Sequence, residues 1–460
     1  PVPVPSARSV ALDILLQRET PGDFLEHRLE ALPGMRALSD DDRRLAREIA
    51  FGVLRNRSAL DHLVASRTDG RPQRPVLRGI LQSGLYQLIF LDRVPDHAAV
   101  NEAVLLARQR GFSAQAGFVN AVLRGVARDR DACRRALDAL RLSDPATGWS
   151  HPGWLVARWS AELGPGMLQR RLGWDNSAPR IFARVNRIRT TPQALVARWQ
   201  SEGVVAVPET FDWVDAGTVF SLDRHPALES LGSFQEGGFY LQDPSTLMAV
   251  HLLDPRPGQR ILDLCAAPGG KALAIAERLG DGGGVVAQDA HPGRLELVRE
   301  NVRRLGAEAR VSVVDRFEDG TTGAVAGPAG GAGAERFDAV LVDEPCSNTG
   351  VLRRRIELRW RRQPGEVPRL AAEQLRLLGV AARRVRPGGT LVYSTCSLEA
   401  EENERVVDAF LEGHPGWVET ARRRLHPAAD SVDGAFAARL VAPAAEPASS
   451  PISESNPNPA

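Results

Sequence analysis

The chain has 460 residues, 43% hydrophobic and 25% charged, with a formal net charge of +1. This length exceeds what one hydrophobic core supports and the composition is that of a globular protein, so we expect two or three domains and no strongly basic field over the whole molecule. No apolar run approaches a membrane span, the start lacks a signal-peptide stretch, and four cysteines do not make a disulfide framework, which together predict a cytoplasmic protein.

Residues 1–142 are predicted to form an all-helical domain. Segments such as RGILQSGLYQLIFL and HAAVNEAVLLARQRG place apolar residues at helical spacing, and prolines and glycines interrupt them. From 143 to 237 we expect a linker helix, in which Trp154 and Trp159 pack, followed by a small α+β subdomain. The chain therefore begins with two parts that carry no evident catalytic motif.

Strands and helices alternate from residue 238 to 440, which predicts an α/β, Rossmann-like domain with a parallel sheet and crossover helices. The segment 441–460 is rich in Pro, Ser and Ala and is predicted to be a disordered tail. The glycine-rich segment 320–335 is predicted to be a flexible surface insert for the same reason. The predicted fold class is a multi-domain chain with its chemistry in the α/β part.

A cofactor site is predicted where RILDLCAAPGGKALAIAERL forms a strand, a glycine-containing turn and a helix, because backbone amides and the helix start can approach a ligand there. It is not a Walker A loop, since Ala272 replaces the required Ser or Thr. Asp289 ends the next apolar strand, where ribose hydroxyls bind, and Asp315 ends the following one, suited to an adenine amino group. Either acid alone fits an ordinary surface carboxylate, but with the glycine turn they predict a nucleoside cofactor.

The basic residues are unevenly used. Lys271 is the only lysine among 58 lysines and arginines, so we expect it where a forked guanidinium does not fit, with chance survival of one codon as the alternative. Arginine runs are usually solvated, but one run directly behind the first thiol motif favours contact with phosphate groups. Its members are Arg353, Arg354, Arg355, Arg359, Arg361 and Arg362.

Two cysteines follow two further predicted strands, Cys346 in LVDEPCSNTG and Cys396 in LVYSTCSLEAEEN. Because the carboxyl ends of parallel strands meet at one sheet edge, we expect both thiols at the ligand-binding edge. A single cysteine after an apolar strand is usually an inert core thiol. Two of them with Asp343 predict covalent chemistry on an electrophilic ring, and a helix predicted directly after Cys396 would help to ionise a thiol, although its acids partly oppose this.

Three motifs, DLCAAPGGK, DEPCSNTG and YSTCSLEAEEN, resemble the cofactor and catalytic motifs of the RsmB/Sun family of RNA 5-methylcytosine methyltransferases. LIFLDRVPDHAAVNEAVLLAR and GFVNAVLRG resemble the NusB-like RNA-binding domain of that family, and SHPGWLVARW and RVN resemble the segment that joins the two parts. The resemblance covers nearly everything except the tail and the glycine-rich insert. It implies S-adenosylmethionine as cofactor, no metal, small-subunit (16S) ribosomal RNA as partner, no membrane, and a monomer.

The resemblance also implies residue roles. The Cys396 thiolate would add to C6 of an extruded cytosine, so that C5 attacks the sulfonium methyl. Asp343, protonated, would hydrogen-bond to N3, and Cys346 would assist release of the adduct after C5 loses its proton. The implied cofactor-binding residues are Cys265, Ala266, Ala267, Pro268, Gly269, Gly270, Lys271, Asp289, Asp315 and Asp343.

This sequence departs from the family pattern at Glu344 and Asn348, where DEPCSN replaces DAPCS and a small residue, and RRRIELRW replaces RRHPDIKW. If Glu344 points away from Asp343 by strand alternation it is harmless, but if it faces the site it adds a carboxylate beside a thiol. The alternatives are methylation of a transfer RNA and a noncatalytic RNA-binding or ribosome-assembly factor. Methylation of an adenine amino group would require an Asp-Pro-Pro-Tyr-like turn, where Cys346 and Ser347 stand instead.

Overall fold

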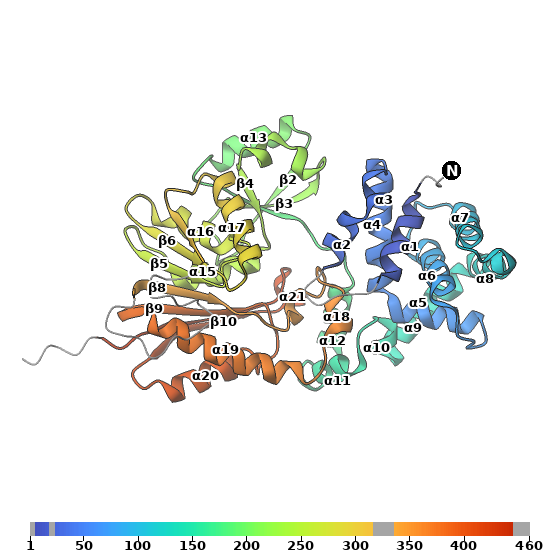
Figure 1. The fold of residues 1–460 in the computed structure, drawn as a ribbon. Coiled ribbons are helices and arrows are strands. Elements are labelled where there is room, and N and C mark those ends of the chain that lie inside the picture. Colours follow the sequence, from blue (N-terminus) through green and yellow to red (C-terminus); the bar gives the residue numbers. More distant parts are fainter. Residues whose placement is uncertain (1–4, 18–23, 316–334, 445–460) are drawn as a thin grey trace, which may run out of the picture. The chain divides into compact units, whose positions relative to one another are not determined.

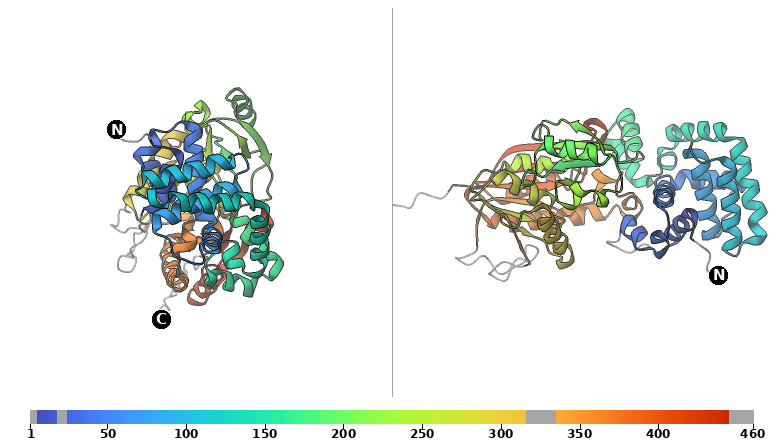
Figure 2. Two further views of the ribbon diagram at one scale, coloured as in Figure 1. Left: turned by 90° about the vertical axis from the view of Figure 1, so that its right-hand side faces the viewer. Right: turned by 90° about the horizontal axis from the view of Figure 1, so that it is seen from above.

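The computed structural model describes residues 5–17, 24–315 and 335–444, and these divide into two compact units. Unit 1 comprises Pro1–Pro179, Asn348–Glu366 and Pro427–Ser431. Unit 2 comprises Arg180–Ser347, Val367–His426 and Val432–Ala460. Each unit is drawn in Figure 1, with two further views in Figure 2. Both units are therefore assembled from segments that are distant in the sequence.

Unit 1 is helical. Its α-helices and 3₁₀ turns are α1 (Ala7–Leu16), α2 (Leu25–Ala31), α3 (Pro33–Arg36), α4 (Asp40–Arg55), α5 (Arg57–Arg67), α6 (Pro75–Phe90), α7 (Asp96–Gln109), η1 (Ser113–Gln115), α8 (Ala116–Arg128), α9 (Arg130–Ser143), α10 (Pro145–Gly148), α11 (Gly153–Glu162), α12 (Pro165–Asp175), η4 (Thr349–Val351), α18 (Leu358–Arg361) and α21 (Pro427–Asp430). The predicted N-terminal helical domain is confirmed.

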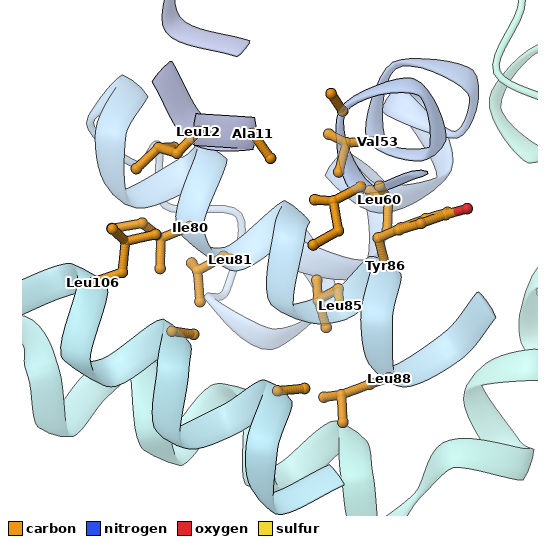
Figure 3. Close-up of a cluster of buried hydrophobic side chains, with 14 of the residues drawn as sticks. Ala11, Leu12, Val53, Leu60, Ile80, Leu81, Leu85, Tyr86, Leu88 and Leu106 are labelled. Atoms are coloured by element: carbon orange, nitrogen blue, oxygen red, sulfur yellow. The ribbon is translucent and has the colours of Figure 1, made fainter. Parts of the chain in front are cut away.

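Helix α6 lies at the centre of the unit 1 core. Apolar residues occur on all of its sides, which is typical of a buried helix rather than a surface one. Figure 3 shows its side chains, including Ile80, Leu81 and Leu85, between those of α1, α4, α5 and α7. Ile356, from the segment that joins unit 1 late in the sequence, belongs to the same core. The helical spacing in the sequence thus corresponds to one continuous apolar interior.

A buried charged cluster in unit 1 changes the interpretation of the arginine run. Arg359 is fully buried, where it donates to Asn176 Oδ1 at 2.6 Å and to the backbone oxygen of Asp175. Arg353 is also buried, with its guanidinium 4.0 Å from the ring centroid of Trp174. Burial lowers the pKa of Arg359 to about 9. These two arginines hold the unit together, so the expectation that the whole run contacts phosphate groups is wrong for them.

Unit 2 contains a small antiparallel sheet with the order β2-β3-β1-β4. Its elements are β1 (Phe182–Val185), α13 (Pro192–Ser201), β2 (Val205–Glu209), β3 (Val219–Arg224), η2 (Leu228–Ser230), α14 (Gly232–Gln235) and β4 (Phe239–Leu241). Trp199 of α13 packs edge-on against Phe220 and Phe239. β4 pairs with β1, so this sheet continues past the boundary predicted at residue 237.

The second sheet of unit 2 has seven strands in the order β10-β11-β9-β8-β5-β6-β7. Its strands are β5 (Arg260–Leu264), β6 (Gly284–Gln288), β7 (Val311–Val314), β8 (Phe337–Asp343), β9 (Val385–Thr395), β10 (Val418–Leu425) and β11 (Ala435–Val441). The central pairs β7–β6, β6–β5, β5–β8 and β8–β9 are parallel, as predicted. β10 and β11 pair antiparallel, because they form a hairpin rather than crossing over through a helix.

Helices cover both faces of this sheet, as Figure 1 shows. One face packs with α15 (Leu247–Leu253), α16 (Gly270–Leu279) and α17 (Pro292–Leu305), which follow the turn η3 (Pro244–Thr246). The other packs with α19 (Glu366–Arg383) and α20 (Glu404–Gly413). The strand order reverses between the neighbouring strands β5 and β8. Ligands of open α/β sheets bind at the carboxyl ends of the strands where such a reversal occurs. The predicted Rossmann-like fold class is confirmed.

Most of the predicted glycine-rich insert and of the predicted tail lies outside the described residues. β11 ends at Val441, the first residue of that predicted tail. Among the residues that are described, none of the helices combines the length and the apolar character that a membrane crossing needs.

Candidate active site

The glycine turn after β5 has a geometry that only small residues allow. Gly269 lies in the left-handed region, with φ 105°, directly before α16. A Cβ on Gly270 would lie 2.9 Å from a ring carbon of Tyr240, closer than real Cβ contacts. Cys265 also has a positive φ, 69°, which is uncommon for a residue with a side chain. The turn therefore presents backbone rather than side chains at the start of α16.

Asp289 fixes this turn from the end of β6. Its side chain is buried, and its two oxygens accept hydrogen bonds from the amides of Ala267, at 3.2 Å, and His291, at 3.1 Å. Each carboxylate oxygen has a second lone pair, so the group can also accept from a ligand hydroxyl. Asp315, at the end of β7, is 63% exposed and pairs with Arg299 at 2.7 Å. Both acids stand at strand ends as predicted, and only Asp289 is integrated into the turn.

Lys271 and Asp343 form an ion pair between α16 and the end of β8. Lys271 Nζ donates to Asp343 Oδ2 at 2.6 Å, and the Ser394 hydroxyl donates to Oδ1 at 3.0 Å. Burial alone lowers the pKa of Lys271, but the carboxylates of Asp343 and Asp263 outweigh it and the pKa is raised overall. Lys271 therefore stays charged, and both oxygens of Asp343 are occupied by donors.

The two strand-end thiols lie side by side. β8 and β9 are parallel neighbours with Asp343 opposite Ser394, so the turns that follow them leave the sheet at the same edge. Cys346 Sγ and Cys396 Sγ are 3.3 Å apart, and neither is in a disulfide. Cys346 is buried and Cys396 is partly exposed. The structure thus brings both predicted thiols to one place beside Asp343.

The helix predicted directly after Cys396 begins later. α20 starts at Glu404, and the intervening residues form an irregular loop, so no helix N-terminus lies at the Cys396 thiol. The reason is that side chains of the loop compete with helical hydrogen bonding: the Thr395 hydroxyl donates to Asn403, and the amide of Asn403 donates to the backbone oxygen of Ser397. The predicted helix-dipole activation of the thiol is therefore wrong.

Glu344, which departs from the family pattern, is buried. In the part of the chain that is described, neither of its carboxyl oxygens has a hydrogen-bond partner. Burial raises its pKa well above the usual range, and the neighbouring Asp343 and Glu373 raise it further. Burial at this position therefore disfavours the charged form of Glu344.

Three groups of the site escaped the sequence reasoning. Ser394 binds Asp343, as described above. Asp263 of β5 is fully buried, and burial followed by the charges of Asp343 and Asp289 raises its pKa to about 8, although Lys271 opposes the shift. Glu402 is buried below both thiol turns. An acid inside the apolar run RILDL was the one available signal for Asp263, whereas Glu402 looked like one of several acids on a solvated helix.

Comparison with known proteins finds family matches in three parts of the chain. Residues 250–441 match the family described as 16S rRNA methyltransferase RsmB/F, residues 5–128 the NusB family, and residues 151–214 the RsmF/B-like, ferredoxin-like domain. "Probable ribosomal RNA small subunit methyltransferase B" of Bacillus subtilis is 34% identical over 417 residues, 89% of each chain. "Ribosomal RNA small subunit methyltransferase B" of Salmonella arizonae is 34% identical over 445 residues, 94% of this chain and 98% of the relative.

Among solved structures, the crystal structure of PH0851 covers 96% of this chain and 99% of its own, with a TM-score of 0.74 and 23% identity, which supports the fold. Fold and matches together define the class: a Rossmann-like methyltransferase with a helical NusB-type domain and a small ferredoxin-like domain. The chain belongs to the 16S rRNA methyltransferase RsmB/F family. The resemblance drawn from the three motifs is thereby confirmed.

Proposed function

We propose that this protein transfers a methyl group from S-adenosylmethionine to C5 of a specific cytosine in small-subunit (16S) ribosomal RNA, through a covalent adduct between Cys396 and C6 of the base. The observation that carries the proposal is the contact of two thiols, 3.3 Å apart, beside Asp343. Nucleophilic attack requires only one thiol. A second thiol in contact with the first can act on the adduct that the first thiol forms. The names of the relatives support ribosomal RNA as the substrate class.

Cys396 is the proposed nucleophile because it is the more accessible thiol and lies within the field of Lys271. The negative charge of a Cys396 thiolate is among the influences that raise the pKa of Lys271. Cys346, buried beside it, would assist release of the adduct after C5 loses its proton.

Asp343 would stabilise the charge that develops toward N3 when the thiolate adds to C6. Both of its oxygens accept hydrogen bonds, from Lys271 and Ser394, which is the pattern of an ionised carboxylate. The protonated form proposed from the sequence therefore requires a proton on substrate binding.

The residues of the turn fit S-adenosylmethionine, which supplies the methyl group when bound. The start of α16, which follows Gly269, would offer backbone amides to the methionine carboxylate. The buried Asp289 has lone pairs for ribose hydroxyls. Residues 265 to 271, with Asp289, Asp315 and Asp343, remain the proposed binding set.

The proposal is tested by trapping the adduct with 5-fluorocytosine in a small-subunit RNA fragment, in the presence of S-adenosylmethionine. Fluorine cannot leave C5 as a proton does, so the adduct persists on a denaturing gel. Wild type and Cys346→Ala should trap RNA, and Cys396→Ala should not. Trapping by Cys396→Ala together with its loss in Cys346→Ala would reverse the roles.

The RNA target is tested by bisulfite sequencing of RNA from cells with and without the protein. We expect one protected cytosine in small-subunit ribosomal RNA to disappear on deletion. Loss of a protected cytosine in a transfer RNA instead would show that the substrate is a transfer RNA. Cofactor binding without methyl transfer to any RNA would favour a noncatalytic assembly factor.

A further inference from the structure

One buried carboxylate joins the two turns that carry the thiols. Ser347 directly follows Cys346, and Ser397 directly follows Cys396. The two serine hydroxyls are 3.1 Å apart, and both donate to Oε2 of Glu402. The backbone amide of Ser347 donates to Oε1 of the same residue at 2.8 Å. Each thiol is thus one residue away from a hydrogen bond to Glu402.

Gln374 of α19 extends this connection on both sides. Its side-chain amide donates to Glu402 Oε1 at 3.1 Å and to the backbone oxygen of Pro345 at 2.9 Å. The hydroxyl of Tyr393, on β9, donates to Gln374 Oε1 at 3.3 Å and to the backbone oxygen of Glu402. The residue before Cys346 and the strand that leads to Cys396 are therefore both hydrogen-bonded to Gln374 or Glu402.

The side chain of Glu402 is fully buried, so it makes no contact with water that could replace these bonds. Four donors reach its two oxygens: two hydroxyls, one backbone amide and one side-chain amide. A buried carboxylate with all its partners is rigid, whereas removal of its acceptors leaves several buried donors unsatisfied. A small shift of either turn would therefore also move the thiol that the turn carries.

We propose that Glu402 is a positioning residue that sets the distance between Cys346 and Cys396, and thereby couples release of the adduct to its formation. The inference rests on the proposed function of the two thiols. Glu402 itself touches neither thiol through these hydrogen bonds and acts through Ser347 and Ser397. Loss of the Glu402 carboxylate should slow release of the adduct, the step assigned to Cys346, more than it slows the first addition by Cys396.

The spacing is tested first without RNA or cofactor, by oxidation of the full chain with diamide. Diamide takes two electrons and two protons from a thiol pair and is reduced to a hydrazine, leaving one S–S bond. The wild-type thiols, 3.3 Å apart, should form this bond quickly, seen as a loss of two maleimide-reactive cysteines and of about two mass units. In Glu402→Gln, the side-chain NH₂ group replaces one acceptor oxygen and faces groups that are themselves donors. We therefore expect the rate of disulfide formation to fall on the order of tenfold.

The functional consequence is tested with unmodified RNA and S-adenosylmethionine. Glu402→Gln should accumulate a covalent protein–RNA adduct that wild type releases, with on the order of tenfold more adduct at steady state. Glu404→Gln, an acid of α20 that pairs with Arg424 and is 29% exposed, is the matched control and should behave as wild type. The double variant Ser347→Ala/Ser397→Ala, which removes only two hydroxyls, should show both effects more weakly.

Unchanged diamide rate and unchanged adduct level in a folded Glu402→Gln would overturn the inference. If Glu402→Gln does not fold, the serine double variant decides in the same way. A diamide effect without any adduct in wild type or variants would separate the two proposals, because it would support the spacing role and contradict the covalent mechanism.

Discussion

The ammonium of Lys271 donates a single hydrogen bond to Asp343 Oδ2 at 2.6 Å. An ammonium is a compact charge, and here it reaches Asp343 from a side chain that is 14% exposed. A guanidinium is planar and larger and directs its donors along a fork, so it cannot occupy the same space with the same single contact. This shape requirement is our explanation for the one lysine in an arginine-rich chain, with chance survival as the alternative.

We expect Lys271→Arg to lower the methyl-transfer rate on the order of tenfold or more, although the charge is retained, because the donor to Asp343 is displaced. Single-turnover rates with saturating cofactor measure this effect. Arg383→Lys, at an exposed position, is the matched exchange and should leave the rate unchanged. A fully active Lys271→Arg would show that the lysine survived by chance.

Asp263 should make stability depend on pH. Burial raises its pKa in the folded protein to about 8, whereas in the unfolded chain the carboxyl ionises near pH 4. The stability that the protonated form contributes is fully present below about pH 4 and is lost as the pH rises through about 8. Between these limits the Tm of wild type should decline more steeply than that of Asp263→Asn.

Thermal unfolding at a series of pH values, in buffers of equal ionic strength, measures this difference. Asp281→Asn, whose side chain is 99% exposed, should keep the wild-type slope. Parallel slopes for wild type and Asp263→Asn would contradict a proton on Asp263.

At the scale of elements, the approach of α4 to α6 depends on one glycine. An ideal Cβ on Gly52 of α4 would lie 1.9 Å from Cζ of Tyr86 on α6, so the ring occupies the space of a missing side chain. The Tyr86 hydroxyl donates to Glu48 at 2.5 Å, one turn earlier on α4. Helical spacing in the sequence indicates both helices. It does not indicate which side chain of a neighbouring helix packs against a glycine.

Gly52→Ala should therefore lower the free energy of unfolding by about 1–3 kcal/mol through overpacking. Gly117→Ala, near the start of α8 with no atom within 4 Å of the added Cβ, should be neutral or stabilise by up to about 1 kcal/mol. Urea midpoints of the full chain compare the two. Combining Gly52→Ala with Tyr86→Leu should recover part of the loss, and equal midpoints for the two alanine variants would contradict the packing argument.

At the scale of the whole molecule, the arginines divide between structural and exposed positions. Arg359 is fully buried and bound to Asn176 and Asp175, whereas Arg383 is exposed. The arginines of β10 are engaged as well: Arg422 pairs with Asp408, Arg423 with Asp212, and Arg424 with Glu404. With a net charge of +1, attraction of RNA must come from a local subset of arginines rather than from the molecule as a whole.

Arg359→Met should destabilise unit 1 by about 1–3 kcal/mol, because it leaves the side-chain oxygen of Asn176 and the backbone oxygen of Asp175 without their donor. Arg383→Met should change stability by less than about 0.5 kcal/mol. Differential scanning calorimetry of both variants measures the contrast. Equal melting of Arg359→Met and Arg383→Met would mean that the buried cluster contributes nothing to folding.

The sequence by itself determined the helical part, the Rossmann-like part and the strand ends at Asp289, Asp343 and Cys396, because apolar periodicity and glycine turns are local signals. The sequence also placed both thiols at one sheet edge, whereas only the tertiary structure decided which side chains bind to which. Glu402 and Asp343 are both acids in the sequence, yet one accepts from serines below the thiols and the other from Lys271. The charged form of Glu344 is disfavoured and Arg359 is structural because burial, not residue type, sets the cost of a charge.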